Sequence, residues 1–270
     1  MINVVSAART APRIASRAHF EAELVRKILS GAYPAGSKLP GERLLAVESG
    51  LSRPVVREVL RGMVERGLID VIPARGAYVN APDMMQLAGV AGPAARQQGA
   101  TPRDLVEARE LIEAQAARRA AERASPEDVE RLQNLVDAFD RAGSTIERTQ
   151  CDLALHASIA QLSGNPVLGI LFGAIAPLVL DVQLRSLADP AILHRGAPMH
   201  HDIVDAISQK DPDRAAAKMS EHILLALEMY GGDLDVPLSE LAVGRLEGLL
   251  GSQRQLQDIV HGVLTTYRSS

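Results

Sequence analysis

The sequence predicts a mainly α-helical protein in two parts: a small helical unit with a hairpin at the N-terminus, followed by an antiparallel all-helical bundle. Three observations support this fold class. Apolar residues recur at helical spacing along most of the 270 residues. Pro, Gly, Ser and Thr fall between these runs at positions typical of helix ends. Aromatic residues make up only 3% of the chain and Trp is absent, which favours helices packed through aliphatic side chains.

Two short helices are expected at the start of residues 18–80. The first runs from about Phe20 to a stop at Gly31, and the second ends at Gly50. The apolar side of the second helix is expected to consist of Leu44, Leu45 and Val47.

A third helix and a hairpin complete this region. Ser52 is suited to cap the helix, and Pro54 is tolerated because it falls in the first turn. The side facing the core repeats at helical spacing and comprises Val55, Val56, Val59, Leu60 and Met63. Short strands are expected at 68–72 and 77–80, on either side of a turn at 73–76. Together these elements describe a winged helix-turn-helix.

A row of arginines lies on the third helix. Arg53, Arg57 and Arg61 are spaced four apart, so they share the exposed side opposite the apolar one. Arg75 adds a positive charge at the hairpin tip. Recognition in the major groove and contact with phosphates both require such side chains, although an arginine row can also be an ordinary solvated helix face.

The charge of the chain is divided unevenly. Residues 1–80 contain 12 Lys and Arg against 7 Asp and Glu, a net charge of +5. The remaining 190 residues contain 17 against 26, a net charge of −9. A basic end on an acidic protein favours a polyanionic partner for that end, and double-stranded DNA fits this expectation.

The stretches LPGER, SRPVVREVLRGMVERGLI and RGAYV resemble the N-terminal DNA-binding domain of the GntR superfamily of bacterial transcription regulators. Gly41 departs from the family pattern, which usually has Ser or Ala there, but Gly can still cap a helix. With the resemblance, the candidate DNA-binding residues are Arg43, Ser52, Arg53, Arg57, Arg75 and Gly76.

Two segments border this domain. Residues 1–17 lack an apolar period and are expected to form a flexible arm, and residues 81–100 are expected to form a linker in which 84–90 could be a short helix. The single cysteine excludes an internal disulfide framework and fits a reducing cytoplasm. No signal segment opens the chain, and the longest apolar stretch, 167–180, is too short to span a membrane.

From Thr101 the pattern is helical to about residue 230. Thr101 and Ser125 each precede a Pro and have an Asp three residues later, an arrangement typical of helix starts. Helices are expected at about 101–123, 125–139, 147–163, 166–186, 190–208 and 212–230. Joined by short turns, they predict an antiparallel bundle over 101–230. Residues 231–270 are expected to be a helical extension that covers the bundle, bridges to the N-terminal domain or adds to a dimer contact.

Four residues of the bundle could form a metal site. Asp152 and His156 lie four apart and share one helix face. His200 and His222 lie on two later helices and could both point inward. One carboxylate and three imidazoles would satisfy a divalent transition metal and leave positions for a ligand. Ordinary histidines near the bundle surface are the alternative.

The stretches DLALHASIAQLSGNPVLGIL, HHDIVDAISQKDPDRAAAKMSEHI and EARELIEAQAARRAAERAS resemble the FCD ligand-binding domain of the FadR-like branch. The resemblance implies a metal site and leaves His201 outside it. Cys151 is next to Asp152 but should face elsewhere on the helix, about 100° away, and is not expected to be a ligand. Zinc is the first expectation, with nickel or manganese as alternatives. The ligands that the resemblance implies are Asp152, His156, His200 and His222.

Three further residues are candidates to bind an acidic effector. Arg109 stands in an E-x-R-x-x-x-E position of the family, and Arg185 lies at the end of the fourth bundle helix. Arginine binds carboxylates in two-point fashion, although Arg185 could equally be a surface residue. Asn165 could reach the cavity, but a helix cap before Pro166 is favoured. The resemblance implies a sugar acid or a small hydroxycarboxylate.

The expected function is that of a transcription regulator of the repressor type. A homodimer would bind a near-palindromic operator, and a small carboxylate bound at the metal would modulate that binding. A metal-dependent hydrolase or lyase is an alternative, but no HExxH occurs and Glu221 should point away from His222. A dimeric DNA-binding protein that responds to no ligand is a further alternative.

Overall fold

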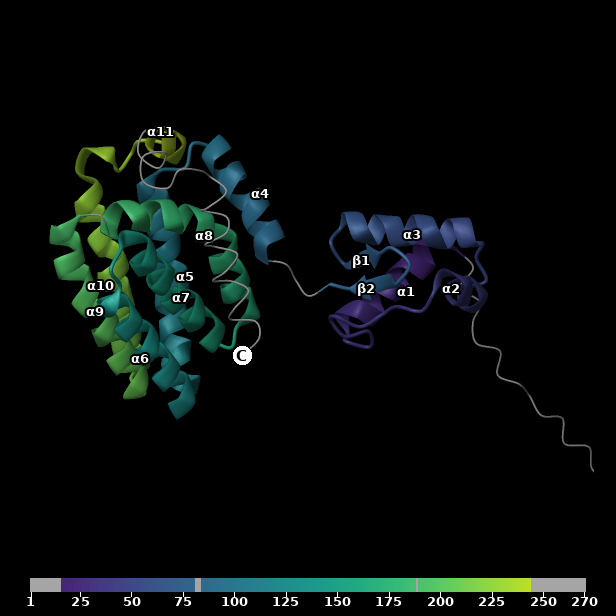
Figure 1. Cartoon of the computed structure of the whole chain (residues 1–270), viewed down its shortest axis with the longest axis horizontal. Coiled ribbons are helices and arrows are strands. Elements are labelled where there is room, and N and C mark those ends of the chain that lie inside the picture. The colour runs from purple at the N-terminus through teal and green to yellow at the C-terminus, as the bar shows by residue number, and fades with distance from the viewer. Residues whose placement is uncertain (1–15, 81–83, 188, 244–270) are drawn as a thin grey trace, which may run out of the picture. The chain divides into compact units, whose positions relative to one another are not determined.

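The computed structural model describes residues 16–80, 84–187 and 189–243. The chain divides into two compact units, Met1–Asp83 and Met84–Ser270. We call residues 16–80 the N-terminal unit and residues 84–243 the bundle, and describe each by itself (Figure 1). Most of the predicted arm, and the predicted helical residues beyond 243, lie outside the described residues.

The N-terminal unit has the predicted order of elements: helix α1 (Arg17–Leu29), α2 (Glu42–Ser49), α3 (Arg53–Glu65), strand β1 (Ile69–Ile72) and β2 (Gly76–Val79). Ser16 caps α1 by accepting a hydrogen bond from the backbone N–H of His19. Gly50 ends α2 in the left-handed conformation, with φ of 72°. Ser52 is the N-cap residue of α3, but its side chain makes no capping hydrogen bond.

Side chains from every element meet in the core of the N-terminal unit. The buried apolar residues are Phe20, Leu24, Leu39, Leu45, Val56, Val59, Leu60, Met63, Ile69 and Val79. One expectation was wrong: Leu44 and Val47 are 51% and 75% exposed, so Leu45 alone of the expected apolar side is buried. Because α2 has only 8 residues, its narrow inner face holds Leu45 and Ser49, one turn apart.

The hairpin pairs β1 and β2 in antiparallel register, from Ile69 opposite Val79 to Ile72 opposite Gly76. Gly76 has a φ of +113°, which side-chain-bearing residues rarely adopt. A Cβ at this position would also come within 2.9 Å of Cε of Lys38. The hairpin tip therefore depends on glycine at position 76 for its backbone conformation, whereas the flexible Lys38 side chain could move away from a Cβ.

The bundle consists of helices α4 (Met84–Gln97), α5 (Pro102–Arg123), α6 (Pro126–Arg141), α7 (Thr145–Leu162), α8 (Pro166–Leu187), α9 (Pro190–Ser208) and α10 (Pro212–Tyr230), then a 3₁₀ turn (Gly231–Asp233) and α11 (Leu238–Val243). Capping boxes begin α5, α6 and α7, in which Thr101, Ser125 and Ser144 pair with the acidic residue three positions on. These local bonds explain why the predicted helix starts agree closely with the observed ones.

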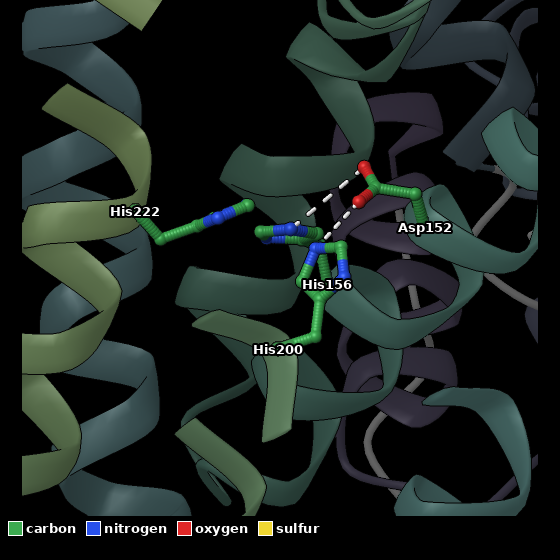
Figure 2. Close-up of side chains that lie close together, drawn as sticks. All are labelled: Asp152, His156, His200 and His222. Atoms are coloured by element: carbon green, nitrogen blue, oxygen red, sulfur yellow. Dashed lines mark ion pairs between the residues drawn. The ribbon is translucent and has the colours of Figure 1, made fainter. Parts of the chain in front are cut away.

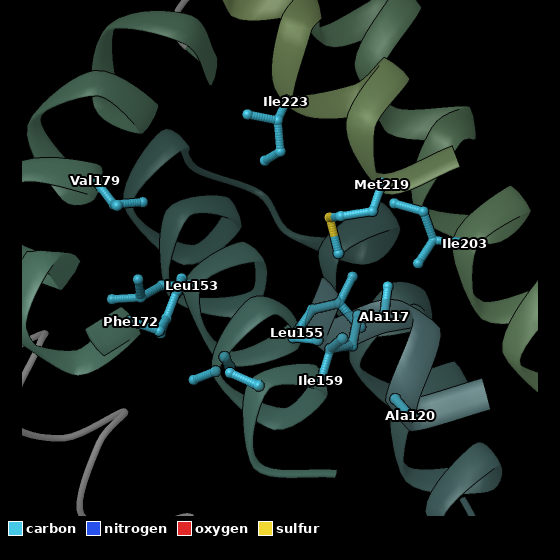
Figure 3. Packing of buried hydrophobic residues seen from close by; sticks show 14 of the residues in the cluster. Ala117, Ala120, Leu153, Leu155, Ile159, Phe172, Val179, Ile203, Met219 and Ile223 are labelled. Carbon is cyan, nitrogen blue, oxygen red and sulfur yellow. The ribbon is translucent and has the colours of Figure 1, made fainter. Parts of the chain in front are cut away.

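Small side chains let the central helices of the bundle approach one another closely. Helix α5 packs against α7, α8, α9 and α10. Its buried alanines are Ala116, Ala117, Ala120 and Ala121. Larger aliphatic residues from the neighbouring helices fill the space around them, among them Leu155, Ile203 and Met219 (Figure 3). A backbone approach of this kind brings residues on α5, α7, α9 and α10 within reach of one another.

The predicted linker was wrong for most of its length. Residues 84–97 form helix α4, which packs against α8 and belongs to the bundle. Its Gly and Pro residues resemble a linker in composition, but Ala88 is buried. The start of the predicted extension also lies on the bundle, because the backbone N–H of Leu238 donates to the carbonyl of Ala100 at 2.8 Å. In the part of the chain that the structure describes, no helix is both long and apolar enough to cross a membrane.

Candidate metal centre

Helix α7 presents Asp152 and His156 on one buried face. The two residues lie one turn apart, and Nε2 of His156 is 3.8 Å from Oδ2 of Asp152. Every residue of α7 from Asp152 to Ala160 is buried. Both polar side chains are therefore held inside the bundle, away from bulk water.

Helices α9 and α10 bring two more imidazoles to the same place. Nε2 of His200 lies 2.7 Å from Oδ1 of Asp152, and the ring centroid of His222 lies 4.6 Å from that of His200. Figure 2 shows the four side chains gathered together. One possible ligand atom from each residue lies within 4.8 Å of all the others. The fold thus brings together the whole set that the sequence singled out.

The nitrogens at the centre of this cluster are buried and lack hydrogen bonds. In the described part of the chain, no hydrogen-bond partner is present for Nε2 of His156, for either ring nitrogen of His200, or for Nδ1 of His222. The contact between His200 and Asp152 is short but lacks hydrogen-bond geometry. Buried polar atoms are nearly always partnered. Orphaned nitrogens this close together, beside a carboxylate, fit the donor set of a divalent transition metal.

Glu113 on α5 holds the other side of His156. Its Oε2 contacts Nδ1 of His156, and its Oε1 accepts a hydrogen bond of 2.6 Å from Nε of Arg109. When His156 is neutral, a carboxylate on Nδ1 favours the tautomer with its proton there, which leaves the Nε2 lone pair on the side of Asp152. Burial opposes ionisation of Glu113, but the charges of Arg109 and His156 outweigh it, so the pKa of Glu113 is below its usual value.

Sequence reasoning gave Glu113 no role, although Glu113 is the last residue of the E-x-R-x-x-x-E position noted for Arg109. In the structure Arg109 and Glu113 are 4% and 1% exposed. A signal was present in the sequence. Opposite charges four residues apart continue the line of Ala116 and Ala120 along the helix, and this line is the buried side.

Gln183 on α8 binds one oxygen of Asp152. Its Nε2 donates to Oδ2 of Asp152, while Oδ1 faces His200. Burial alone would raise the pKa of Asp152, but the charges of His156 and His200 outweigh burial and hold the pKa well below its usual value. Sequence reasoning also missed Gln183, because a single amide within an apolar run carries no spacing signal.

His222 is kept neutral by its surroundings. Burial lowers its pKa well below the usual value, and the neighbouring His200 and His156 lower it further. A neutral imidazole is the form that binds metals. The adjacent Glu221 is exposed and pairs with Lys218 at 2.8 Å, away from this centre.

A cavity of about 50 Å³ lies beside the four residues. Its polar lining residues are Arg109, Asp152, Gln183, His200 and His222. Its other lining residues are Phe139, Val182, Leu187, Ile192, Leu193, Gly196, Ala197, Ile223, Leu225 and Ala226. Nη2 of Arg109 is buried and has no hydrogen-bond partner among the described residues. Arg109 therefore offers a free donor beside the cavity, held in place by Glu113.

Other candidates lie elsewhere. Oδ1 of Asn165 accepts a hydrogen bond of 3.0 Å from the backbone N–H of Val167, so Asn165 caps α8 and is not among the residues that line the cavity. The side chain of Arg185 lies outside the described residues. His201 is exposed and pairs with Asp140 at 2.8 Å. Cys151 is half-buried and is not part of the four-residue cluster.

The candidate DNA-binding residues lie on the N-terminal unit. Arg57 on α3 makes two hydrogen bonds to Glu42, of 3.1 Å from Nε and 2.8 Å from Nη2. Nη2 of Arg53 lies 4.0 Å from the same carboxylate. Gly76 is half-buried in the hairpin, whereas the exposed candidates are Arg43, Ser52, Arg53, Arg57 and Arg75.

Two protein families match the chain. "Bacterial regulatory proteins, gntR family" matches residues 17–79, and "FCD domain" matches residues 104–225. The chain is 32% identical to the galactonate operon transcriptional repressor of Escherichia coli, over 71% of this chain and 86% of that protein. It is 29% identical to the HTH-type transcriptional repressor NanR of Cronobacter sakazakii, over 75% of this chain and 80% of that protein.

The fold also has a solved counterpart. A structure described as Streptococcus agalactiae GntR covers 79% of this chain and 100% of its own, with a TM-score of 0.65 and 24% identity. This likeness concerns the fold alone. Together the matches confirm the two resemblances and the predicted fold class, and the matched families and named relatives are transcription regulators rather than enzymes.

Proposed function

The chain belongs to the gntR family of bacterial regulatory proteins and carries an FCD domain, so it is a DNA-binding transcription regulator, and we propose that it is a repressor controlled by a small organic acid at a metal centre. The acid would be a sugar acid or a hydroxycarboxylate. The metal would be a divalent transition ion, with zinc favoured by the donor set and nickel or manganese as alternatives.

The charge of the N-terminal unit supports operator recognition through α3 and the hairpin. Arg53 and Arg57 lie on the exposed side of α3, and Arg75 lies beside the hairpin tip. In proteins of this architecture the second helix of the motif enters the major groove. We propose DNA contacts by Arg43, Ser52, Arg53, Arg57 and Arg75, with Gly76 allowing the tip to approach the duplex.

The observation that carries the metal proposal is the group of buried imidazole nitrogens without hydrogen bonds around Asp152. Leaving several such atoms unpartnered would be costly, because each loses its hydrogen bonds to water. A dication accepts lone pairs from His156, His200 and His222 and is neutralised in part by Asp152. When bound, it would attract and orient a carboxylate.

The cavity beside this centre supports an acidic effector. Arg109 lines the cavity, and its Nη2 has no partner among the described residues. A guanidinium donor and a metal on one cavity are complementary to a carboxylate. An acid that contacts both would change the packing of α5, which carries Arg109, against α7 and α10.

Two copies of the chain would place two α3 helices on the half-sites of a near-palindromic operator. Effector binding would then alter the spacing between the two α3 helices. Coupling free energies between sites are typically about 1–3 kcal/mol, or roughly 5- to 150-fold in DNA affinity. The molar mass of the protein in solution, measured by light scattering, tests the homodimer.

A matched pair of histidine variants tests the metal centre. His200→Ala should lose the metal that copurifies with the protein, whereas His201→Ala should retain it, because His201 pairs with Asp140 on the surface. Elemental analysis of the purified proteins measures the difference. Equal metal content in both variants would contradict the proposed ligand set.

Measurements of DNA affinity test whether the metal and the effector regulate the protein. Duplexes selected by the protein from a random pool provide a binding site, and fluorescence anisotropy measures affinity with and without chelator and with added acids. We expect a change of at least about 5-fold when metal-loaded protein receives its effector. Affinity that stays constant under all these conditions would favour a dimeric DNA-binding protein that responds to no ligand.

A further inference from the structure

We propose that Gln183 and Arg109 select a short 2-hydroxycarboxylate over a polyhydroxylated sugar acid. This inference rests on the proposed function, because it names the effector class of the same site. It follows from the polar atoms that the described cavity lining leaves free, from their donor or acceptor character, and from the size of the cavity.

The cavity contains few groups that could recognise a ligand. Five of its fifteen described lining residues are polar or charged. Three of these five, Asp152, His200 and His222, belong to the proposed metal centre. The other two, Arg109 and Gln183, lie outside that centre and are available to recognise the remainder of an effector.

Each of these two residues has one polar atom in a hydrogen bond and one buried polar atom without a partner among the described residues. Nε2 of Gln183 donates to the Asp152 carboxylate, which can only accept, so the amide oxygen Oε1 is turned away from Asp152. That oxygen is buried and has no hydrogen-bond partner among the described residues. Nε of Arg109 likewise donates to Glu113 at 2.6 Å, while its Nη2 is free. Gln183 and Arg109 thus add an acceptor and a cationic donor to the cavity lining.

One acceptor and one donor match one hydroxyl and one carboxylate oxygen. In a 2-hydroxycarboxylate these groups sit on adjacent carbons, so a single small molecule can satisfy both atoms while its carboxylate also faces the metal centre. The hydroxyl hydrogen would bond to Oε1 of Gln183, and the carboxylate would accept from Nη2 of Arg109. A simple carboxylate would leave Oε1 without its partner.

The rest of the cavity disfavours a sugar acid. The other described lining residues are apolar or small, among them Val182, Ile192, Leu193 and Leu225. Each additional hydroxyl buried there without a partner would cost roughly 5- to 150-fold in affinity. The cavity volume of about 50 Å³ is also far below the roughly 300–1,000 Å³ of typical ligand sites. A 2-hydroxycarboxylate whose hydroxyl-bearing carbon carries only hydrogen or one methyl group in addition fits these apolar walls.

Calorimetric titration of the zinc-loaded full-length protein tests the inference. The probes are glycolate, both enantiomers of lactate, propionate, gluconate and galactonate. We expect glycolate or one lactate enantiomer to bind about 10-fold or more tightly than propionate, which lacks the hydroxyl, and than either aldonate. If gluconate or galactonate binds more tightly than every short acid, the inference is overturned and the proposed function stands. If no acid binds, both are overturned.

A variant then tests the role of Gln183. Gln183→Leu keeps the approximate size and removes the acceptor, so the preference for lactate over propionate should fall to less than about 3-fold. Gln133→Leu, at an exposed position on α6, is the matched control and should keep the full preference. A preference that survives in Gln183→Leu overturns the assignment of the hydroxyl to Oε1. If Gln183→Leu fails to fold, the ligand series on the unmodified protein decides the proposal.

Discussion

Each of the two units contains an arginine–glutamate pair, and the pairs have opposite surroundings. Arg57 and Glu42 in the N-terminal unit are 2.8 Å apart, with side chains 60% and 31% exposed. Arg109 and Glu113 in the bundle are 2.6 Å apart, with side chains 5% and 2% exposed. An exposed pair is screened by water, so a phosphate can replace the glutamate at little cost. A buried pair cannot separate without leaving a charge in a poorly solvating interior.

The contrast teaches how the same two residue types serve different tasks. The exposed pair leaves Arg57 accessible to solvent. The buried pair is a permanent part of the bundle, in which Glu113 also contacts His156. Four substitutions test this contrast.

The largest expected effect is that of Glu113→Ala. It leaves Arg109 buried without a counter-charge and should lower the free energy of unfolding of the bundle by about 3–5 kcal/mol. Urea unfolding followed by circular dichroism measures the change. Glu110→Ala on the same helix is the control. It removes a hydrogen bond of 2.7 Å from Ser220 and should cost only about 0.5–1.5 kcal/mol. Equal losses in the two variants would contradict the role of burial.

Arg57→Ala is expected to weaken binding to a selected duplex by about 1–3 kcal/mol if Arg57 contacts a base. If Arg57 contacts a phosphate, the loss of affinity should be similar for all DNA sequences. The slope of log affinity against log salt concentration should then become shallower by about one unit. Arg26→Ala is the control, because Arg26 is also exposed and paired, with Glu23 on α1. Anisotropy titrations at several salt concentrations distinguish these cases, and equal affinity in both variants would argue against DNA contact by α3.

In the metal-free protein, His222 should make the free energy of unfolding depend on pH. Its folded-state pKa lies well below the usual value, chiefly because of burial, so below about pH 6.5 the unfolded state binds more protons at this residue than the folded state. This contribution should lower the free energy of unfolding as pH falls, by at most about 1.4 kcal/mol per pH unit. His222→Gln should reduce the slope. A slope unaffected by His222→Gln would show that His222 is protonated alike in both states.

The smallest expected effect is that of Glu42→Ala. Loss of the exposed pair with Arg57 should change the free energy of unfolding by less than about 1 kcal/mol, and added salt should shrink the difference further. Thermal unfolding at low and high salt measures both. A loss above about 2 kcal/mol that persists in high salt would mean that this pair resembles the buried one, and the contrast between the two units would fail.

Local chemistry explains what could be predicted from the sequence. Capping residues such as Thr101 and Ser125 fix helix starts through bonds between near neighbours, and the pair Asp152 and His156 shares a face on any regular helix. The sequence pattern alone could not predict that His200 and His222 lie near Asp152, because their positions depend on how α9 and α10 pack. The resemblance to a known domain supplied that information.

The failures arose where packing overrode local pattern. Leu44 and Val47 are apolar but exposed, whereas Arg109 and Glu113 are charged but buried. Apolar periodicity assigns faces by hydrophobicity alone, so it misplaces a helix whose inner side carries a charged pair among alanines. The short helix considered at 84–90 is the first half of α4, but its full length and its place in the bundle were not predicted, since its Gly and Pro content resembles a linker and only its packing against α8 identifies it as part of the bundle.

Glu113 has a consequence for how this protein could diversify. One of its oxygens serves Arg109 and the other serves His156, so a mutation that adapts the arginine to a new effector also withdraws a neighbour from the carboxylate that orients the histidine. Arginine, glutamate and histidine would thus be inherited as a block. New chemical preferences would arise more readily at the apolar walls of the cavity, such as Ile192 and Leu193, which hold none of these polar side chains.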